Sequence, residues 1–328
     1  KVLPVFSVNP ENGYGYSEET KPMLETSHGF IPWDDQHHLS LSQTNAEVDG
    51  RWLFANANNT PRVARIDLKR FKPVEILELP NSAGNYSSPF LTENTEYVVA
   101  GTRFAVPTDD ANGDVPIDSF KENFKGVLSF IGIDQQTGGM DLSFQIEAPG
   151  INFDLSHAGK KKSGDWFFFS CYNSEKANTL LEVNASQNDK DFIMAVNWKK
   201  AAELVKAGKG RKVTTEYAHN TWDESTHSAT STMKKEVVVL SVEDMKDAMF
   251  MIPCPKSPHG CDVDPTGEYI IGSGKLAALI PVFSFDKMIK AIADKNFAGE
   301  YDGVQVIKYE AALHGEVQKP GLGPLHTE

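Results

Sequence analysis

Several of the nine histidines in this 328-residue chain stand at a recurring position, just before an apolar, strand-like segment. They are His37, His38, His157 and His259, and His326 opens a further segment of the same kind. Imidazoles that meet at one place would form a metal site. A shell of histidines without thiolates favours copper, zinc or iron over calcium or magnesium. The spacing does not choose among the three metals, and a single histidine before a strand is more often an ordinary loop residue.

The adjacent pair His37-His38 adds a geometric condition. Neighbouring residues of a strand point to opposite faces, so both rings can reach metal only from a bulge or a turn, or by binding different atoms of a cluster. The pair therefore favours a place outside a regular strand, or a centre with several metal ions.

The histidines belong to a repeated pattern: a polar turn, an aromatic residue, an apolar strand, and a second strand that ends in Asp, Asn or Ser. The units run from Trp52 to Asp67, Tyr97 to Asp134, Trp166 to Asn197 and Tyr269 to Ser284. A unit of about 40–50 residues that cannot bury its own sheet faces must stack on its neighbours. The sequence predicts an all-β fold, with a β-propeller favoured over a β-sandwich. Histidines before the innermost strands of its blades would converge on the axis.

The chain is expected to divide into an irregular lead-in, residues 1–33, and a partial β-propeller domain, residues 34–328. Two helices are predicted from apolar spacing, over Trp198–Ala207 and Phe285–Ile292. Residues 211–235 are polar and predict an exposed excursion between blades. The last residues resemble the entry to another unit, so the propeller is expected to be incomplete.

Composition excludes several classes of protein. The 32 basic and 45 acidic residues give a formal net charge of −13, which disfavours nucleic acid and anionic membranes as partners. No apolar run is long enough to predict a membrane span. The cysteines Cys171, Cys254 and Cys261 form neither a disulfide framework nor a zinc pattern, and are predicted to be small buried hydrophobic residues.

Six ordered motifs resemble the N-terminal propeller part of nitrous oxide reductase, in the branch of that family exported through the general secretory route. They are Asp35–Ser42, Asp49–Asn56 with Arg62–Asp67, Thr95–Phe104, Cys171–Glu175, Ser257–Gly260 and Gly321–Thr327. They cover nearly the whole chain. The resemblance implies about the first half of a seven-bladed propeller, which a cupredoxin domain follows in the complete family.

The resemblance also implies a function. In this family a four-copper, sulfide-bridged cluster held by seven histidines reduces nitrous oxide to dinitrogen and water, a step of denitrification. His37, His38, His259 and His326 match ligand positions, whereas His157 matches none and is interpreted as a loop residue. The two-copper site where electrons enter belongs to the cupredoxin domain, which this chain lacks, so the fragment is not expected to be active alone.

One ligand position departs from the family. Where a Gly-Asn-His sequence is expected, the chain has Gly84-Asn85-Tyr86. A neutral phenol, with a pKa of about 10, is a poor ligand for soft copper beside imidazole. Tyr86 is expected at the axis, facing the histidines, and to lower copper loading.

Further properties follow from the resemblance alone. They are a calcium ion bound through Tyr172, Glu175 and Asp191, a head-to-tail homodimer, a periplasmic location, and a c-type cytochrome or small copper protein as electron donor. A non-catalytic β-propeller interaction module that has lost cluster binding is the alternative. A hydrolytic propeller with one calcium ion is disfavoured, because such a site needs carboxylates where this chain has imidazoles.

Overall fold

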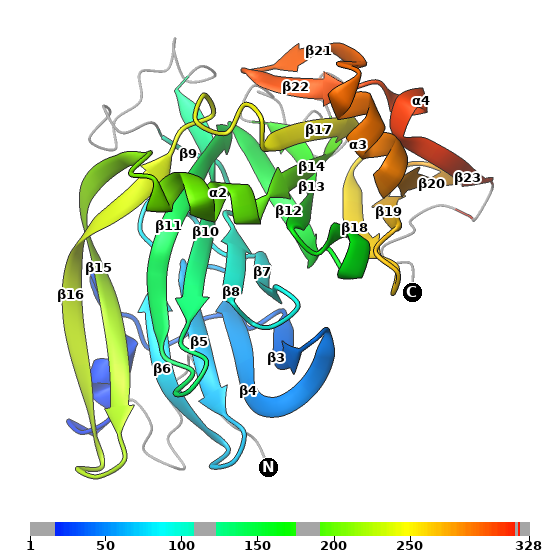
Figure 1. Ribbon diagram of the computed structural model, residues 1–328. Coiled ribbons are helices and arrows are strands. Elements are labelled where there is room, and N and C mark those ends of the chain that lie inside the picture. The colour runs from blue at the N-terminus through cyan, green and yellow to red at the C-terminus, as the bar shows by residue number, and fades with distance from the viewer. Residues whose placement is uncertain (1–16, 108–122, 175–190, 319–320, 322–328) are drawn as a thin grey trace. The chain divides into compact units, whose positions relative to one another are not determined.

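A computed structural model describes residues 17–107, 123–174, 191–318 and 321, with the elements labelled in Figure 1. The fold is all-β, as predicted. The chain divides into two compact units. Unit 1 comprises Lys1–Ala100, Ser129–Gln145 and Arg211–Val239, and unit 2 comprises Gly101–Leu128, Ile146–Gly210 and Leu240–Glu328.

Unit 1 contains two runs of four sequential strands, joined by a hairpin. The runs are β3 (Leu39–Thr44), β4 (Glu47–Ala57), β5 (Arg62–Asp67) and β6 (Lys72–Glu78), then β7 (Ser87–Leu91), β8 (Tyr97–Gly101), β10 (Phe124–Ile133) and β11 (Met140–Pro149). The hairpin strands are β15 (Arg211–Asp223) and β16 (Ser228–Leu240). β10 and β11 extend beyond the bounds of unit 1, and β9 (Val106–Pro107), which pairs with β10 at Phe124 and Lys125, belongs to unit 2. The strand order is β3-β4-β5-β6-β15-β16-β11-β10-β8-β7.

Unit 2 contains two further sheets, in each of which four strands pair antiparallel in chain order, with two strands of another sheet inserted before the fourth. The first is β12 (Ile151–Ala158), β13 (Trp166–Ser174), β14 (Phe192–Asn197) and β17 (Met249–Pro253), extended by β22 (Val304–Ile307) and β21 (Phe297–Tyr301). The second is β18 (Pro258–Val263), β19 (Tyr269–Gly274), β20 (Leu279–Ser284) and β23 (Leu313–Gln318). Four sequential antiparallel strands are the topology of a propeller blade.

The predicted repeat is visible in the strand register. In three of the four predicted units, the aromatic residue of the second strand pairs with the polar residue that ends the third. The pairs are Trp52 with Asp67, Trp166 with Asn197, and Tyr269 with Ser284. The polar turn between the first two strands therefore lies at the same edge as the polar end of the third strand.

Both predicted helices are confirmed as α2 (Trp198–Lys206) and α3 (Phe285–Ala293), and a one-turn helix, α4, spans Tyr309–Ala312. The polar residue that ends the preceding strand caps each long helix. Asn197 accepts a hydrogen bond from the Lys200 amide at 2.9 Å, and Ser284 from the Lys287 amide at 3.2 Å. Such caps satisfy amides that have no partner within the helix.

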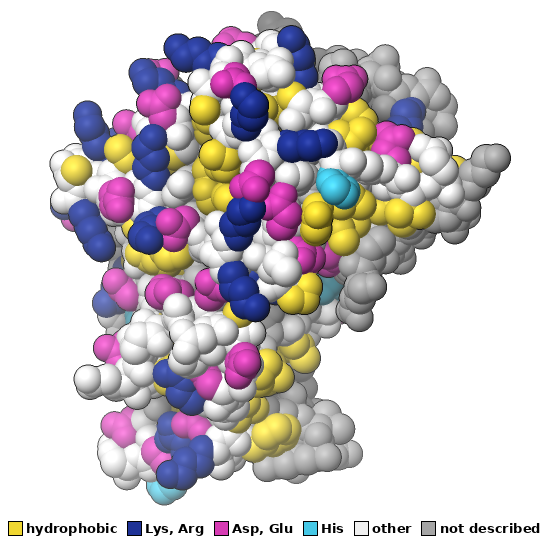
Figure 2. Space-filling view, turned by 45° about the vertical axis from the view of Figure 1, so that its right-hand side comes forward, with side chains coloured by type: hydrophobic (Ala, Val, Ile, Leu, Met, Phe, Trp, Pro, Cys, Tyr) yellow, Lys and Arg dark blue, Asp and Glu magenta, His cyan; other side chains and the backbone are white. Residues whose placement is uncertain are grey.

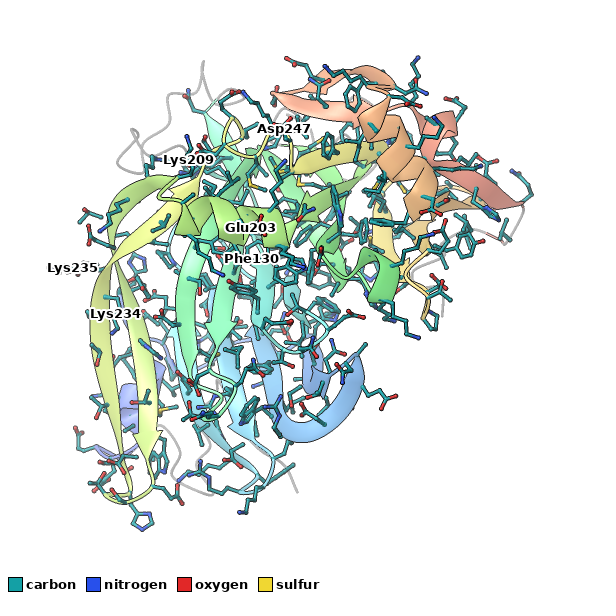
Figure 3. All side chains as sticks on the ribbon, viewed as in Figure 1. Phe130, Glu203, Lys209, Lys234, Lys235 and Asp247 are labelled. Carbon is teal, nitrogen blue, oxygen red and sulfur yellow. The ribbon has the colours of Figure 1, made fainter. Side chains whose placement is uncertain are left out.

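Residues 211–235, predicted to be an exposed excursion between blades, are mostly exposed and form regular structure, most of the β15–β16 hairpin. β15 joins β6, with His219 opposite Leu77 and Thr221 opposite Glu75. The segment contains six threonines, whose branched side chains favour strands. The side chains of Lys234 and Lys235, both exposed, lie along β16 (Figure 3).

The described end of the lead-in also has structure. A short 3₁₀ helix (Lys21–Leu24) precedes a small ladder between β1 (Glu25–Thr26) and β2 (Gly29–Phe30). Met23 and Leu24 are fully buried, in a cluster that includes Ala55, Ala57 and Ile76. The lead-in therefore contributes to the core of unit 1.

The remaining core is aromatic and aliphatic. In unit 1, Phe130, which is labelled in Figure 3, stacks on Phe144, with ring centroids 4.8 Å apart. Cys171 and Cys261 are buried, as predicted, and burial raises the pKa of both thiols; Cys254 is half-buried. Acidic and basic side chains are interspersed on the face seen in Figure 2. No helix within the described ranges is long and apolar enough to cross a membrane.

Two glycines of unit 1 offer a matched test of packing. Gly50 and Gly138 both have a left-handed backbone, with φ of +71° and +77°. A Cβ on Gly138 would lie 2.4 Å from Trp52 Cε2, whereas one on Gly50 would meet nothing within 4 Å. We expect Gly50→Ala to lower the free energy of unfolding by about 1–2 kcal/mol, the left-handed cost for an L-residue. Gly138→Ala should lose a further ~1–3 kcal/mol from overpacking. Urea unfolding gives both values, and equal losses would contradict the contact with Trp52.

Candidate metal centre

His37 and His38 lie immediately before β3 and are held by one buried side chain of β4. Asn56 Oδ1 accepts the backbone amides of His37, at 3.0 Å, and His38, at 2.8 Å. The backbone amide of Asn56 in turn donates to the His38 carbonyl at 3.3 Å. The two rings stand edge to face, with centroids 4.8 Å apart. Asn56 therefore fixes the backbone of the pair outside the regular strand.

A second buried residue anchors the segment that leads to the pair. The fully buried Arg62 guanidinium donates to the Ile31 carbonyl at 3.1 Å and lies 3.7 Å from the Asp34 carboxylate. Asn58 donates its backbone amide to the Asp35 carbonyl at 2.8 Å and its side-chain amide to the Asp35 carboxylate at 2.9 Å. The segment that precedes the histidines is therefore held by polar contacts to β5 and to the connection between β4 and β5.

The same buried network places Tyr86. Asn56 Nδ2 donates to the Asn85 carbonyl at 2.7 Å, and Asn85 Nδ2 donates to the Arg62 carbonyl at 3.2 Å. The Tyr86 hydroxyl lies 3.0 Å from His37 Nε2. Its ring centroid is 4.7 Å from that of His37 and 4.9 Å from that of His38. The structure thus brings together three of the side chains singled out from the sequence.

His259 occupies the corresponding place in unit 2, at the second residue of β18. Its Nδ1 lies 2.9 Å from Asp154 Oδ2, and Lys275 Nζ lies 2.8 Å from the same oxygen. Burial of Asp154 acts to raise its pKa. The hydrogen bond from His259 and the Lys275 ammonium outweigh burial and hold the pKa of this carboxyl below its ordinary value.

His157 does not occupy that place. The sequence pattern aligned it with His259, because both stand at a similar distance before an aromatic residue. The structure puts His157 at the next-to-last position of β12, whereas His259 is near the start of β18. The reason is the longer β12–β13 connection, which includes the 3₁₀ turn Lys161–Ser163. Desolvation and the nearby Lys160 ammonium lower the pKa of His157.

The remaining site predictions are only partly covered by the structure. His326 and Glu175 lie outside the described residues. Asp191 accepts the Ser257 amide at Oδ2 and the Cys254 amide at its carbonyl, both at 2.9 Å. Within the described ranges, no group of three or more His, Cys, Asp or Glu residues is arranged to hold a metal ion.

Sequence reasoning missed Asn56, Asp154 and Lys275. A signal was available for two of them, since Asn56 and Asp154 are polar residues inside apolar strand segments and both are buried. Buried polar side chains are expected to have specific partners. Their partners are distant in sequence, so the pattern alone did not identify them.

The fold and these sites define a class: an all-β protein with propeller-type sheets that presents histidines at the first strands of two of them. No family model matches the chain. The chain is 32% identical over 329 residues to a nitrous-oxide reductase from Pseudomonas fluorescens, covering 99% of this chain and 45% of that protein. The nitrous-oxide reductase of Stutzerimonas stutzeri is 30% identical over 328 residues, with the same coverage of 99% and 45%. The chain is therefore a homologue of nitrous-oxide reductase, as its motifs predicted, and spans about half the length of the curated relatives it matches.

The matches among solved structures are more distant. The β-propeller domain of Myceliophteria thermophila Cps50 (Swd1) matches with 10% identity and a TM-score of 0.32, covering 88% of this chain and 74% of that one. Kuenenia stuttgartiensis hydrazine synthase matches with 12% identity and a TM-score of 0.28, covering 87% of each chain. Likeness at this level has no bearing on function.

The role of Asn56 can be tested directly. Asn56→Ala should lower the free energy of unfolding by about 2–4 kcal/mol, because it removes the acceptor of two part-buried amides and the donor to the buried Asn85 carbonyl. The amide protons of His37 and His38 should exchange faster. The matched control is Asn59→Ala, since the Asn59 side chain is exposed and its backbone amide makes the hydrogen bond to Asp34. Urea unfolding and hydrogen exchange measure both, and unchanged protection in Asn56→Ala would contradict this role.

Proposed function

We propose that this chain is the propeller part of a copper-dependent nitrous oxide reductase, in which His37, His38, His259 and His326 bind copper of a four-copper sulfide cluster. The observation that carries the proposal is the identity of 30–32% with nitrous-oxide reductases over 99% of the chain. The six ordered motifs include three of these four histidines within the described part of the chain.

The described histidines suit this role chemically. His259 Nδ1 faces a carboxylate, the arrangement typical of metal-binding histidines, in which the second ring nitrogen faces the metal. His37 and His38 are held through their backbone by Asn56, so neither ring is needed to position the segment. Imidazole nitrogen is a suitable donor for copper.

A bound copper–sulfide cluster would supply the two electrons that accompany cleavage of the N–O bond of nitrous oxide. The residues of this chain would contribute the fixed geometry of the donors. Asn56 fixes the backbone of His37 and His38, and Asp154 fixes the ring of His259. The Tyr86 hydroxyl places a proton-bearing group beside His37.

The complete protein would have further parts and partners. We propose a cupredoxin domain with a two-copper site for electron entry, a c-type cytochrome or small copper protein as donor, and a homodimer. We also propose a calcium ion bound through Tyr172, Glu175 and Asp191. These proposals rest on the resemblance to the family.

A second candidate function is a non-catalytic interaction module that has lost the cluster. One contact favours it: the Tyr86 hydroxyl lies 3.0 Å from His37 Nε2, so a phenol stands where the family supplies another imidazole and contacts a nitrogen that would bind copper. A set of two imidazoles and a phenol fits an all-histidine copper site poorly.

Replacement of Tyr86 separates the two candidates. In the complete protein, Tyr86→His should raise copper and sulfide content above that of the wild type, because it restores an imidazole at the departing position. Tyr86→Phe is the matched control: it removes the hydroxyl without adding a ligand and should not restore loading. Metal and sulfide are quantified in proteins purified identically. Equal and full loading of all three would show that Tyr86 does not limit cluster assembly.

The reductase proposal also predicts where the mature protein is found. Copper–sulfide assembly in this family follows export, so the complete protein should be recovered from the periplasmic fraction without its signal segment. Fractionation with a cytoplasmic marker measures this. A full-length precursor that accumulates in the cytoplasm with its signal segment retained would contradict the proposal.

A further inference from the structure

One buried carboxylate oxygen in unit 2 is shared by a histidine and a lysine. Asp154 Oδ2 lies 2.9 Å from His259 Nδ1 and 2.8 Å from Lys275 Nζ. We infer that Asp154 and Lys275 are positioning residues for His259, which hold its ring with the proton on Nδ1 and the lone pair on Nε2. The identity of the ligand of Nε2, copper, rests on the proposed function.

Irregular strand pairing brings the two side chains together. The β12–β13 register shifts between Phe153 and Ser156, and the β18–β19 register shifts between Pro258 and Cys261. Asp154 and His259 each lie within one of these shifts. Bulges turn side chains away from the regular alternation of a strand and are common beside functional sites.

One hydroxyl of β13 connects the two irregular segments. Ser170 Oγ donates to the His259 carbonyl at 2.7 Å and accepts the Leu155 amide at 2.9 Å. Ser170 is fully buried, so both hydrogen bonds are shielded from water. The backbones that carry Asp154 and His259 are therefore fixed relative to each other.

The chemistry of the three groups decides where the proton lies. An ionised carboxylate only accepts hydrogen bonds, and a lysine ammonium only donates them. The side chain of Asp154 is 4% exposed and that of His259 is 10% exposed, so water is largely excluded from this contact. His259 Nδ1 must therefore donate, and a neutral ring then carries its lone pair on Nε2.

Lys275 restricts the kind of group that can face His259. Because its ammonium also points at Oδ2, the group at this position must be an acceptor toward both neighbours. The lysine is itself held in place, since its Nζ lies 4.5 Å from the centre of the Tyr172 ring and its backbone amide donates to the Ser257 carbonyl at 3.0 Å. Lys275 therefore prevents a hydrogen-bond donor from replacing the acceptor that faces His259.

A graded set of variants tests this arrangement in the metal-free chain. The protein is labelled with ¹⁵N-histidine, and long-range ¹⁵N–¹H correlations report which ring nitrogen of His259 carries the proton. The His259 signals are assigned by their loss in His259→Gln. The wild type should have the proton on Nδ1. Asp154→Ala should shift it to Nε2, the form that predominates for a neutral histidine in water.

The role of Lys275 is tested with an amide in place of the carboxylate. In Asp154→Asn, the ammonium should keep the amide oxygen toward Lys275 and His259, so the proton stays on Nδ1 in a weaker hydrogen bond. In Asp154→Asn with Lys275→Met, the amide can turn its NH₂ group toward Nδ1, and the proton should move to Nε2. These two variants test the positioning of the His259 ring even if Asp154→Ala fails to fold.

The control removes a carboxylate from a similar pair at the surface. Asp165 pairs with Lys199 at 3.0 Å, with both side chains more than half exposed, and Asp165→Ala should leave the His259 signals unchanged. A wild-type His259 protonated on Nε2 would overturn the inference. So would an Asp154→Ala chain with wild-type His259 signals, or a double variant that matches Asp154→Asn.

Copper affinity separates this inference from the proposed function. Loss of a residue that orients a ligand typically costs about 10–100-fold in metal affinity, so Cu(I) affinity of the complete protein, measured by chelator competition, should fall by that factor in Asp154→Ala. If the proton shifts in Asp154→Ala while the Cu(I) affinity stays unchanged, then Asp154 positions His259 but His259 is not a copper ligand. That result would contradict the proposed function and leave the positioning of His259 standing.

Discussion

The buried amide of Asn56 is the contact on which the candidate centre of unit 1 depends. Its oxygen accepts the amides of His37 and His38, and its nitrogen donates to the carbonyl of Asn85, next to Tyr86. A buried polar group without partners is costly, so all three contacts are expected to form together. Asn56 lies in β4, whose neighbouring residues pack in the core. The strand thereby fixes the two loop segments that contain His37, His38 and Tyr86.

In unit 2, charged side chains position the histidine. Asp154 connects the ring of His259 to the ammonium of Lys275, while Ser170 connects the backbones of the two strands. In unit 1 the contacts fix the histidine backbone, whereas in unit 2 a contact fixes the ring itself. The difference accords with position: His37 and His38 precede a strand, and His259 lies within one, at a shift of register.

The sequence predicted the features of this fold that are local. Turns followed by Trp52, Trp166 and Tyr269 identified the second strands, and Asn197 and Ser284 marked both a strand end and a helix start. The sequence could not predict contacts that depend on strand register, such as that between Asp154 and His259. His157 shows the limit most clearly, because a longer turn moved it to the other end of its strand. Tyr86 was placed beside the histidines only through resemblance to a family.

The central claim is that His37, His38 and His259 bind copper in the complete protein. The most direct measurement is X-ray diffraction from crystals of that protein on both sides of the copper absorption edge. The account predicts anomalous difference peaks within bonding distance of a ring nitrogen of each of the three histidines. Copper peaks elsewhere in fully loaded crystals, with none at these three rings, would contradict it.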